Sequence, residues 1–184
     1  MRHLKAGRKF GRNPTARRAM FRALAANLVL HERIETTDAK AKELRRIADR
    51  LVTRAARLGE DLMVDVGKLA DDERERVVAR RVHAQRLVAR FLPKRVTATR
   101  EGGTYEEVDL IYKLFHEIAP RYMDRVLDPK RSGGGYTRTT KKLARRGDNA
   151  PITVIEWLPA EAKAETPKKK KKAKKAAKTE TEAT

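Results

Sequence analysis

Apolar residues recur at helical spacing in four stretches of the chain and alternate with polar residues in three shorter ones. The helical spacing predicts helices from Asn13 to about His31, from Thr37 to Gly59, from Asp71 to Pro93 and from Thr104 to Pro120. The alternation predicts short strands at residues 33–36, 136–140 and 152–158. The last of these is rich in β-branched and aromatic residues, so we expect it to pair with the strand that precedes it.

Residues that favour helix ends flank each helical stretch. Asn13 followed by Pro14 is typical of a helix start, and Thr37 with Asp38 supplies a cap and a first-turn acid for the second helix. Thr104 with Glu107 has the spacing of a capping box. Between the helices we expect a loop with one helical turn at residues 60–70, a loop at 94–103 and an irregular connection at 121–132.

Each helix has an apolar side that predicts a buried face. In the first helix this side holds Ala16, Met20, Phe21, Ala23, Leu24 and Leu28; in the second, Leu44, Ile47, Ala48, Leu51, Val52, Ala55 and Leu58. In the third it holds Val78, Val82, Leu87 and Phe91, and in the fourth Val108, Ile111, Phe115 and Ile118.

The second helix also has a basic side, on which Lys42, Arg46, Arg50 and Arg54 follow one another at steps of four residues. Neighbouring like charges at this spacing repel by about 0.2–0.5 kcal/mol. One explanation is that Asp38, Glu43 and Asp49 neutralise the row within the helix. The other, which we favour because surface ion pairs are weak, is that the row faces phosphates.

The net charge of +20 is concentrated in three segments. Residues 1–31 and 129–147 contain no acid and carry +8 and +7, and residues 160–184 carry +5, so the rest of the chain is neutral. Basic segments on a balanced body are typical of a protein that binds a polyanion, and nucleic acid is the first candidate. An anionic membrane surface is the weaker alternative, because the basic segments lack a large apolar face.

Other chemistry finds little support. His31 and Glu32 begin a pattern used by zinc proteases, but Glu35 stands where the second histidine is required. No Gly-Lys-Ser/Thr follows Gly133–Gly135, so a phosphate-binding nucleotide loop is not predicted either. We therefore expect no catalytic residue, no metal, no cofactor and no small-molecule substrate.

The glycines precede a basic strand with an aromatic residue. We expect the glycines to let the backbone approach something bulky, and Tyr136, Arg138, Lys141 and Lys142 to present a ring and charges beside it. Such a strand suits RNA.

The ends of the chain differ from its middle. We expect residues 1–12 to form a basic arm that is disordered alone, residues 13–159 to form one domain, and residues 160–184 to be a disordered Lys-rich tail. There is no cysteine, no apolar run of membrane-spanning length and no signal-peptide pattern. We expect a cytoplasmic protein without membrane contact.

Five motifs together carry a resemblance to a known family: MRHLKAGRKFGRNPTARRAMFRAL, LHERIETTDAKAKELRR, KLFHEIAPRY, GGYTR and GDNAPITVIE. In this order, over residues 2–158, they resemble the bacterial large-ribosomal-subunit proteins of the L-seventeen family. The resemblance implies an α+β, two-layer fold of order α-β-α-α-α-β-β, with a small mixed sheet packed against helices. It also implies a place near the nascent-chain exit, contact with large-subunit ribosomal RNA, and neighbouring ribosomal proteins including the thirty-second.

The chain departs from the family pattern at a few positions. Ala23 stands where asparagine is common, residues 94–103 and 123–133 add length, and the lysine tail is longer than usual. None of these changes touches the five motifs.

We therefore predict a structural constituent of the large ribosomal subunit rather than an enzyme. The candidate RNA-binding residues are the basic residues of the arm, of the first two helices and of the strand after the glycines. They are Arg2, His3, Lys5, Arg8, Lys9, Arg12, Arg17, Arg18, Arg22, Lys42, Arg46, Arg50, Tyr136, Arg138, Lys141 and Lys142. A nucleoid-type DNA-binding protein is the alternative, although no groove-reading helix or dimer signature supports it. An RNA-processing enzyme would need converging carboxylates, which the acid-free segments lack.

Overall fold

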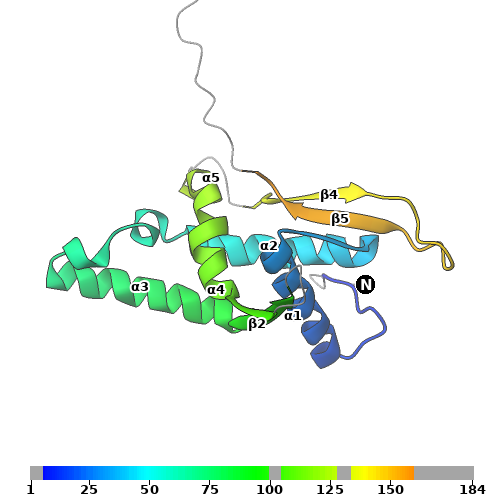
Figure 1. The fold of residues 1–184 in the computed structure, drawn as a ribbon, viewed down its shortest axis with the longest axis horizontal. Coiled ribbons are helices and arrows are strands. Elements are labelled where there is room, and N and C mark those ends of the chain that lie inside the picture. The colour runs from blue at the N-terminus through cyan, green and yellow to red at the C-terminus, as the bar shows by residue number, and fades with distance from the viewer. Residues whose placement is uncertain (1–5, 100–104, 128–133, 160–184) are drawn as a thin grey trace, which may run out of the picture.

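A computed structural model describes residues 6–99, 105–127 and 134–159 (Figure 1). Three long helices, α1 (Pro14–His31), α2 (Asp38–Ala56) and α3 (Asp71–Ala89), are joined to a three-stranded sheet of β1 (Arg33–Thr37), β4 (Thr137–Lys141) and β5 (Ile152–Trp157). The strand order is β1-β5-β4. The predicted order of elements is confirmed, with one added pair of strands between α3 and α4 (Leu110–Lys113).

The sheet is antiparallel throughout, which corrects the expectation of a mixed sheet. Ile155 of β5 lies opposite Ile34 of β1 on one side and Thr139 of β4 on the other, and both neighbours run against β5. The pairing of β4 with β5 is confirmed. A connection of only ten residues, 142–151, joins them and reverses the chain direction, as in a hairpin with a long loop.

Helix α1 begins as its sequence predicts. The side chain of Asn13 accepts a hydrogen bond from the backbone N–H of Ala16 at 2.7 Å, and the helix ends before Glu32, which adopts a left-handed conformation (φ 60°). Its buried face differs in detail from the expected one, because Ala16 and Ala23 are exposed. The buried residues are Phe21, Ala25, Ala26, Leu28 and Val29.

Helix α2 lies at the centre of the fold, between the sheet on one side and α1 and α3 on the other (Figure 1). Its predicted apolar stripe is confirmed, with Ile47 and Leu58 half-buried at its edges. The helix ends at Ala56 rather than at Gly59. Gly59, with φ 57°, instead opens the first of two 3-10 turns, Gly59–Leu62 and Val66–Lys68, in the stretch where one turn was expected.

Helix α3 begins at Asp71 as predicted but turns a different face to α2. Val77, Ala84 and Val88 are buried, whereas Val78 is 39% exposed. The other predicted residues, Val82, Leu87 and Phe91, are half-buried. The predicted apolar residues therefore lie at the margins of the buried face of α3 and not at its centre.

Residues 95–99 and 105–109 form a pair of strands, where a loop followed by a capping box was expected. Strand β2 (Arg95–Thr99) pairs antiparallel with β3 (Tyr105–Asp109), and Glu107 lies in β3, 3.4 Å from Arg95. The cap of the next helix is Asp109, whose Oδ1 accepts the backbone N–H groups of Ile111 and Tyr112, both at 2.9 Å. Thr104 lies outside the described residues.

The fourth helical segment runs past Pro120, which corrects the predicted end. It comprises α4 (Leu110–Lys113), a π-helical turn (Leu114–Ile118), a 3-10 turn (Ala119–Tyr122) and α5 (Met123–Leu127). Pro120 stands in the first turn of the 3-10 segment, where a missing N–H costs little. The segment at 121–127, expected to be irregular, is therefore helical.

Candidate nucleic-acid interface

The basic row of α2 is only partly neutralised by its own helix. Lys42 forms an ion pair with Asp38 at 2.7 Å, as the simpler explanation predicted. The side chains of Arg46 and Arg50 are exposed and have no hydrogen bond or ion pair within residues 6–99, 105–127 and 134–159. The guanidinium of Arg54 donates to the backbone carbonyl of Leu87 at 3.3 Å.

The two other acids of α2 have partners away from this row. Glu43 lies 4.0 Å from Arg8 of the N-terminal arm. Asp49 accepts the backbone N–H of Gly135 at 3.2 Å and that of Tyr136 at 3.3 Å. The positive charge of Arg46 and Arg50 is therefore left available to an external anion.

These arginines surround a surface hollow of about 640 Å³, which we call the arginine hollow. It is lined by Ala6, Arg46, Asp49, Arg50, Thr53, Arg54, Arg57 and Gly134. Four arginines and one aspartate thus line the hollow, and the aspartate is already engaged by Gly135 and Tyr136. Planar guanidinium groups bind phosphate oxygens through paired N–H donors, so the hollow suits a phosphate backbone.

Arg57 was not among the predicted site residues. Its signal was available in the sequence, because it follows Arg50 by seven residues and Arg46 by eleven, which places all three on one side of a helix. It lies outside the strict four-residue spacing that defines the predicted row, and so the row was expected to end at Arg54.

The described part of the arm, residues 6–12, has no regular helix or strand but packs against α1 and α2. The ring of Phe10 meets that of Phe21 edge-on, with centroids 5.6 Å apart. A second hollow, of about 480 Å³, includes Arg8, Lys9, Arg17 and Arg50 in its lining, so this part of the arm adds charge beside the row. Arg2, His3 and Lys5 lie outside the described residues, and the disorder of the arm in the isolated protein stays a prediction.

The remaining predicted residues of the arm and of α1 have separate surroundings. The guanidinium of Arg12 donates to the carbonyl of Phe10 at 3.3 Å. Arg18 donates to the carbonyl of Arg90, just beyond α3, at 3.2 Å, while Arg22 is exposed. Arg18 therefore links α1 to α3 and is not part of the arginine hollow.

The outer face of the sheet carries a second, more balanced set of charges. Arg138 and Arg33 flank Glu156 across the strands, at 2.7 and 3.7 Å, and Lys142 pairs with Glu35 at 2.7 Å. Because side chains alternate along a strand, Arg138 and Lys142 share this face and Lys141 belongs to the other.

Lys141 contributes to the electrostatics at the start of α2. The hydrogen bond from Lys42 is the main cause that lowers the pKa of Asp38, and hydrogen bonding by Thr153 and the charge of Lys141 act in the same direction. Lys141 thus lies near the N-terminal end of the basic row.

Tyr136 is not a surface residue, which corrects its prediction as an RNA contact. Its side chain is 0% exposed, its ring packs on that of Tyr122 with centroids 5.0 Å apart, and its hydroxyl lies 3.3 Å from Oγ1 of Thr53. Gly134 (φ 104°) and Gly135 (φ 71°) bring the backbone against Asp49. A Cβ added at Gly135 would meet no atom within 4 Å, and one at Gly134 only Asp49, at 3.8 Å, so these two glycines serve the left-handed backbone and not the expected close approach to a bulky group.

Tyr122 completes this buried contact between the last helical segment and the sheet. Its hydroxyl donates to the carbonyl of Leu158. Burial raises the pKa of Tyr122 to about 12, so this hydroxyl stays protonated at neutral pH.

Two further features concern metal binding and membrane contact. Among them, no group of three histidine, aspartate or glutamate side chains is placed to hold a metal ion. None of the described helices is long and apolar enough to cross a membrane.

The fold and the arginine hollow define a basic α+β protein of the class that binds polyanions. Residues 20–158 match the family model described as "Ribosomal protein L17". The chain belongs to this family, which confirms the resemblance carried by the five motifs.

Individual relatives agree with the family match. The chain is 49% identical over 160 residues to "Large ribosomal subunit protein bL17" of Sorangium cellulosum, covering 87% of this chain and 84% of the relative. The protein of the same name from Halalkalibacterium halodurans is 42% identical over 150 residues, covering 82% and 97%. The one from Geobacter metallireducens is 40% identical over 174 residues, covering 95% and 72%.

Proposed function

We propose that this protein is a structural constituent of the large ribosomal subunit and binds large-subunit ribosomal RNA through the arginine hollow. The relatives carry the name of a large-subunit protein, and the hollow supplies the matching chemistry. Such binding requires no catalytic residue, so the proposed role is to hold ribosomal RNA in place and not to catalyse a reaction.

The observation that carries the proposal is the pair Arg46 and Arg50. Both are exposed on α2, and neither guanidinium has a partner in the described chain although three acids occupy the same helix. Keeping like charges four residues apart costs stability. An external polyanion that releases counterions on binding offsets that cost.

The arm and the outer sheet face extend the proposed surface. Arg8, Lys9 and Arg17 lie beside Arg50 around the second hollow, where they can follow the same RNA backbone. Arg138 and Lys142 already have carboxylate partners, so they contribute less net charge. A position near the nascent-chain exit, a contact with the thirty-second protein of the subunit and a cytoplasmic location remain predictions of the family resemblance.

The test compares two charge-matched double variants in binding to transcribed large-subunit ribosomal RNA. Arg46→Gln/Arg50→Gln removes the two unpaired guanidinium groups, whereas Arg74→Gln/Arg76→Gln removes two exposed ones from α3, outside both hollows. We expect the first to lower affinity about tenfold or more. It should also flatten the dependence of log affinity on log salt by roughly 0.7–0.9 for each phosphate that the variant no longer neutralises.

The control variant should change both quantities much less. Equal effects of the two variants would contradict a role for the arginine hollow. Equal affinity for cognate RNA and for duplex DNA of the same length would favour the DNA-binding alternative.

A further inference from the structure

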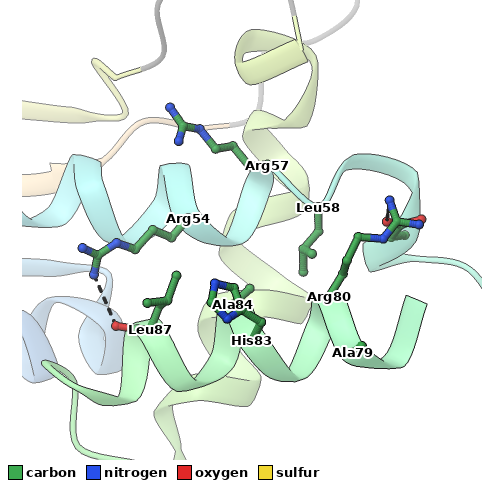
Figure 2. A pocket seen from close by; sticks show the side chains of 9 residues that line it. Arg54, Arg57, Leu58, Ala79, Arg80, His83, Ala84 and Leu87 are labelled. Atoms are coloured by element: carbon green, nitrogen blue, oxygen red, sulfur yellow. Dashed lines mark hydrogen bonds and ion pairs between the residues drawn. The ribbon is translucent and has the colours of Figure 1, made fainter. Parts of the chain in front are cut away.

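A groove with an apolar floor lies between α2 and α3, beside the arginine hollow (Figure 2). We call it the α2–α3 groove; it encloses about 480 Å³. Its lining residues are Arg54, Arg57, Leu58, Asp61, Ala79, Arg80, His83, Ala84 and Leu87. The volume lies within the range of sites that hold small organic groups.

The groove combines an apolar floor with cationic ends. Figure 2 shows Leu58, two residues beyond the end of α2, pointing toward α3, while His83 and Leu87 lie along α3. Arg54 closes one end, where it donates to the carbonyl of Leu87 at 3.3 Å, and Arg80 stands at the other, 2.8 Å from Asp61. These two guanidinium groups are held in place before any ligand arrives.

The groove is continuous with the arginine hollow. Arg54 and Arg57 line both, and in Figure 2 the side chain of Arg57 extends from α2 away from α3. The guanidinium of Arg57 has no hydrogen bond or ion pair among the described residues. Because Arg54 and Arg57 line both, a phosphate backbone in the hollow brings its neighbouring nucleotide beside the groove, which suits an apolar, flat group.

We infer that the α2–α3 groove receives one unpaired nucleobase of the bound RNA, while the adjoining phosphates lie at Arg54 and Arg57. This inference rests on the proposed function. RNA-binding proteins take up splayed-out bases by stacking them on aromatic, histidine or guanidinium planes, and stacking tolerates any base. His83, Arg54 and Arg80 supply such planes in the lining, so the groove selects an unpaired base by its flat face.

The test measures binding to a hairpin RNA whose stem is fully paired, contains one unpaired adenosine, or contains an abasic residue at that place. For the wild-type chain we expect the unpaired adenosine to raise affinity roughly tenfold over the paired stem, a typical effect of base stacking. The abasic stem should lose this gain, and an unpaired uridine should keep most of it. Equal affinity of the wild-type chain for the paired stem and the stem with the unpaired adenosine would overturn the inference.

Two charge-matched variants locate the effect. Ala79→Glu places a carboxylate at the groove, while Gln85→Glu adds the same charge at an exposed position of α3 outside it. Glutamate is a good helix former, so both should fold, and circular dichroism checks this. We expect Ala79→Glu to abolish the preference for the unpaired base and Gln85→Glu to retain it. His83→Ala, which removes a stacking plane from the groove, should reduce the preference.

The outcomes separate this inference from the function on which it rests. Suppose that Arg46→Gln/Arg50→Gln lowers the affinity for the paired stem while the wild-type chain shows no preference for the unpaired base. In that case the groove is not a base site and the proposed function stands. Loss of the preference in Ala79→Glu and Gln85→Glu alike would also overturn it. Binding of a poly-glutamate peptide that Ala79→Glu alone abolishes, without a base preference, would assign the groove to an acidic protein segment instead.

Discussion

Asp49 of α2 accepts the backbone N–H of Tyr136, at 3.3 Å from its Oδ1, and so joins the middle of the basic row to the start of β4. Its second oxygen accepts the N–H of Gly135 at 3.2 Å. This carboxylate therefore stabilises the chain crossing over α2, although its sequence position would allow it to pair with an arginine of the row.

Replacing Asp49 should lower the stability of the fold without lowering its affinity for RNA. In Asp49→Asn one of the two accepting oxygens becomes an amide nitrogen that cannot accept, so we expect the free energy of unfolding to fall by about 1 kcal/mol. Removing a negative charge from the arginine hollow should leave RNA affinity equal or higher. Urea unfolding and RNA titration measure the two quantities, and lower affinity in a folded variant would contradict this assignment.

Tyr136 provides a test that distinguishes a buried ring from an RNA-stacking ring. Tyr136→Phe keeps the packing against Tyr122 and should lower stability by less than about 1 kcal/mol, with RNA affinity unchanged. Tyr136→Ala should cost about 3–5 kcal/mol because it leaves a cavity. If Tyr136→Ala kept its stability and reduced only RNA affinity, the ring would have to lie at the RNA.

Charges on the outer sheet face should matter less than those of the arginine hollow. Arg138→Gln/Lys142→Gln removes two cations that Glu156 and Glu35 already neutralise in part. We expect a drop in RNA affinity of about threefold, smaller than that of Arg46→Gln/Arg50→Gln, with a smaller change of salt slope. The measurement is a salt titration of both variants on the same RNA, and the reverse ranking would place the main contact on the sheet.

The Glu32–Arg121 pair predicts a pH dependence of stability. Glu32 accepts two hydrogen bonds from Arg121, at 2.7 and 3.0 Å, and these lower its pKa below the ordinary value of 4.5, against a smaller raising effect of burial. Because the folded-state pKa is the lower one, the stabilisation is full above the unfolded-state value and is lost as pH falls through the folded-state value.

Glu32→Gln should thus lower the free energy of unfolding by about 1 kcal/mol at neutral pH, at the low end for charged pairs because this one is partly exposed. Unfolding at a series of pH values should show the difference between wild type and variant shrinking below about pH 4. A difference that stayed constant down to acid pH would show that the charge of Glu32 does not matter.

The sequence was sufficient where a local signal decides the structure. Asn13 before Pro14, the apolar stripe of α2 and the alternation in residues 152–157 act within a few residues, so the corresponding elements were predicted near their observed bounds. The basic row of α2 was found in the same way.

The errors arose where a tertiary contact decides. Which face of α3 is buried depends on how α3 packs against the other elements, and the buried Ala84 gives a weaker periodic signal than the exposed Val78. Pro120 was expected to end a helix. Instead the hydrogen bonding changes from π-helical to 3-10 at this point, so the proline stands in a first turn and the helical segment continues. The inward direction of Tyr136 follows from the contact of Gly135 with Asp49, 86 residues apart in the sequence.

The central claim is tested most directly by sedimentation of cell lysate through a sucrose gradient, with the protein followed across the fractions. We predict that the wild-type chain sediments with large subunits and intact ribosomes, and that Arg46→Gln/Arg50→Gln, expressed in competition with it, is depleted from both. Arg74→Gln/Arg76→Gln should sediment as the wild type does. Absence of the wild-type chain from the large-subunit and ribosome fractions would contradict the account.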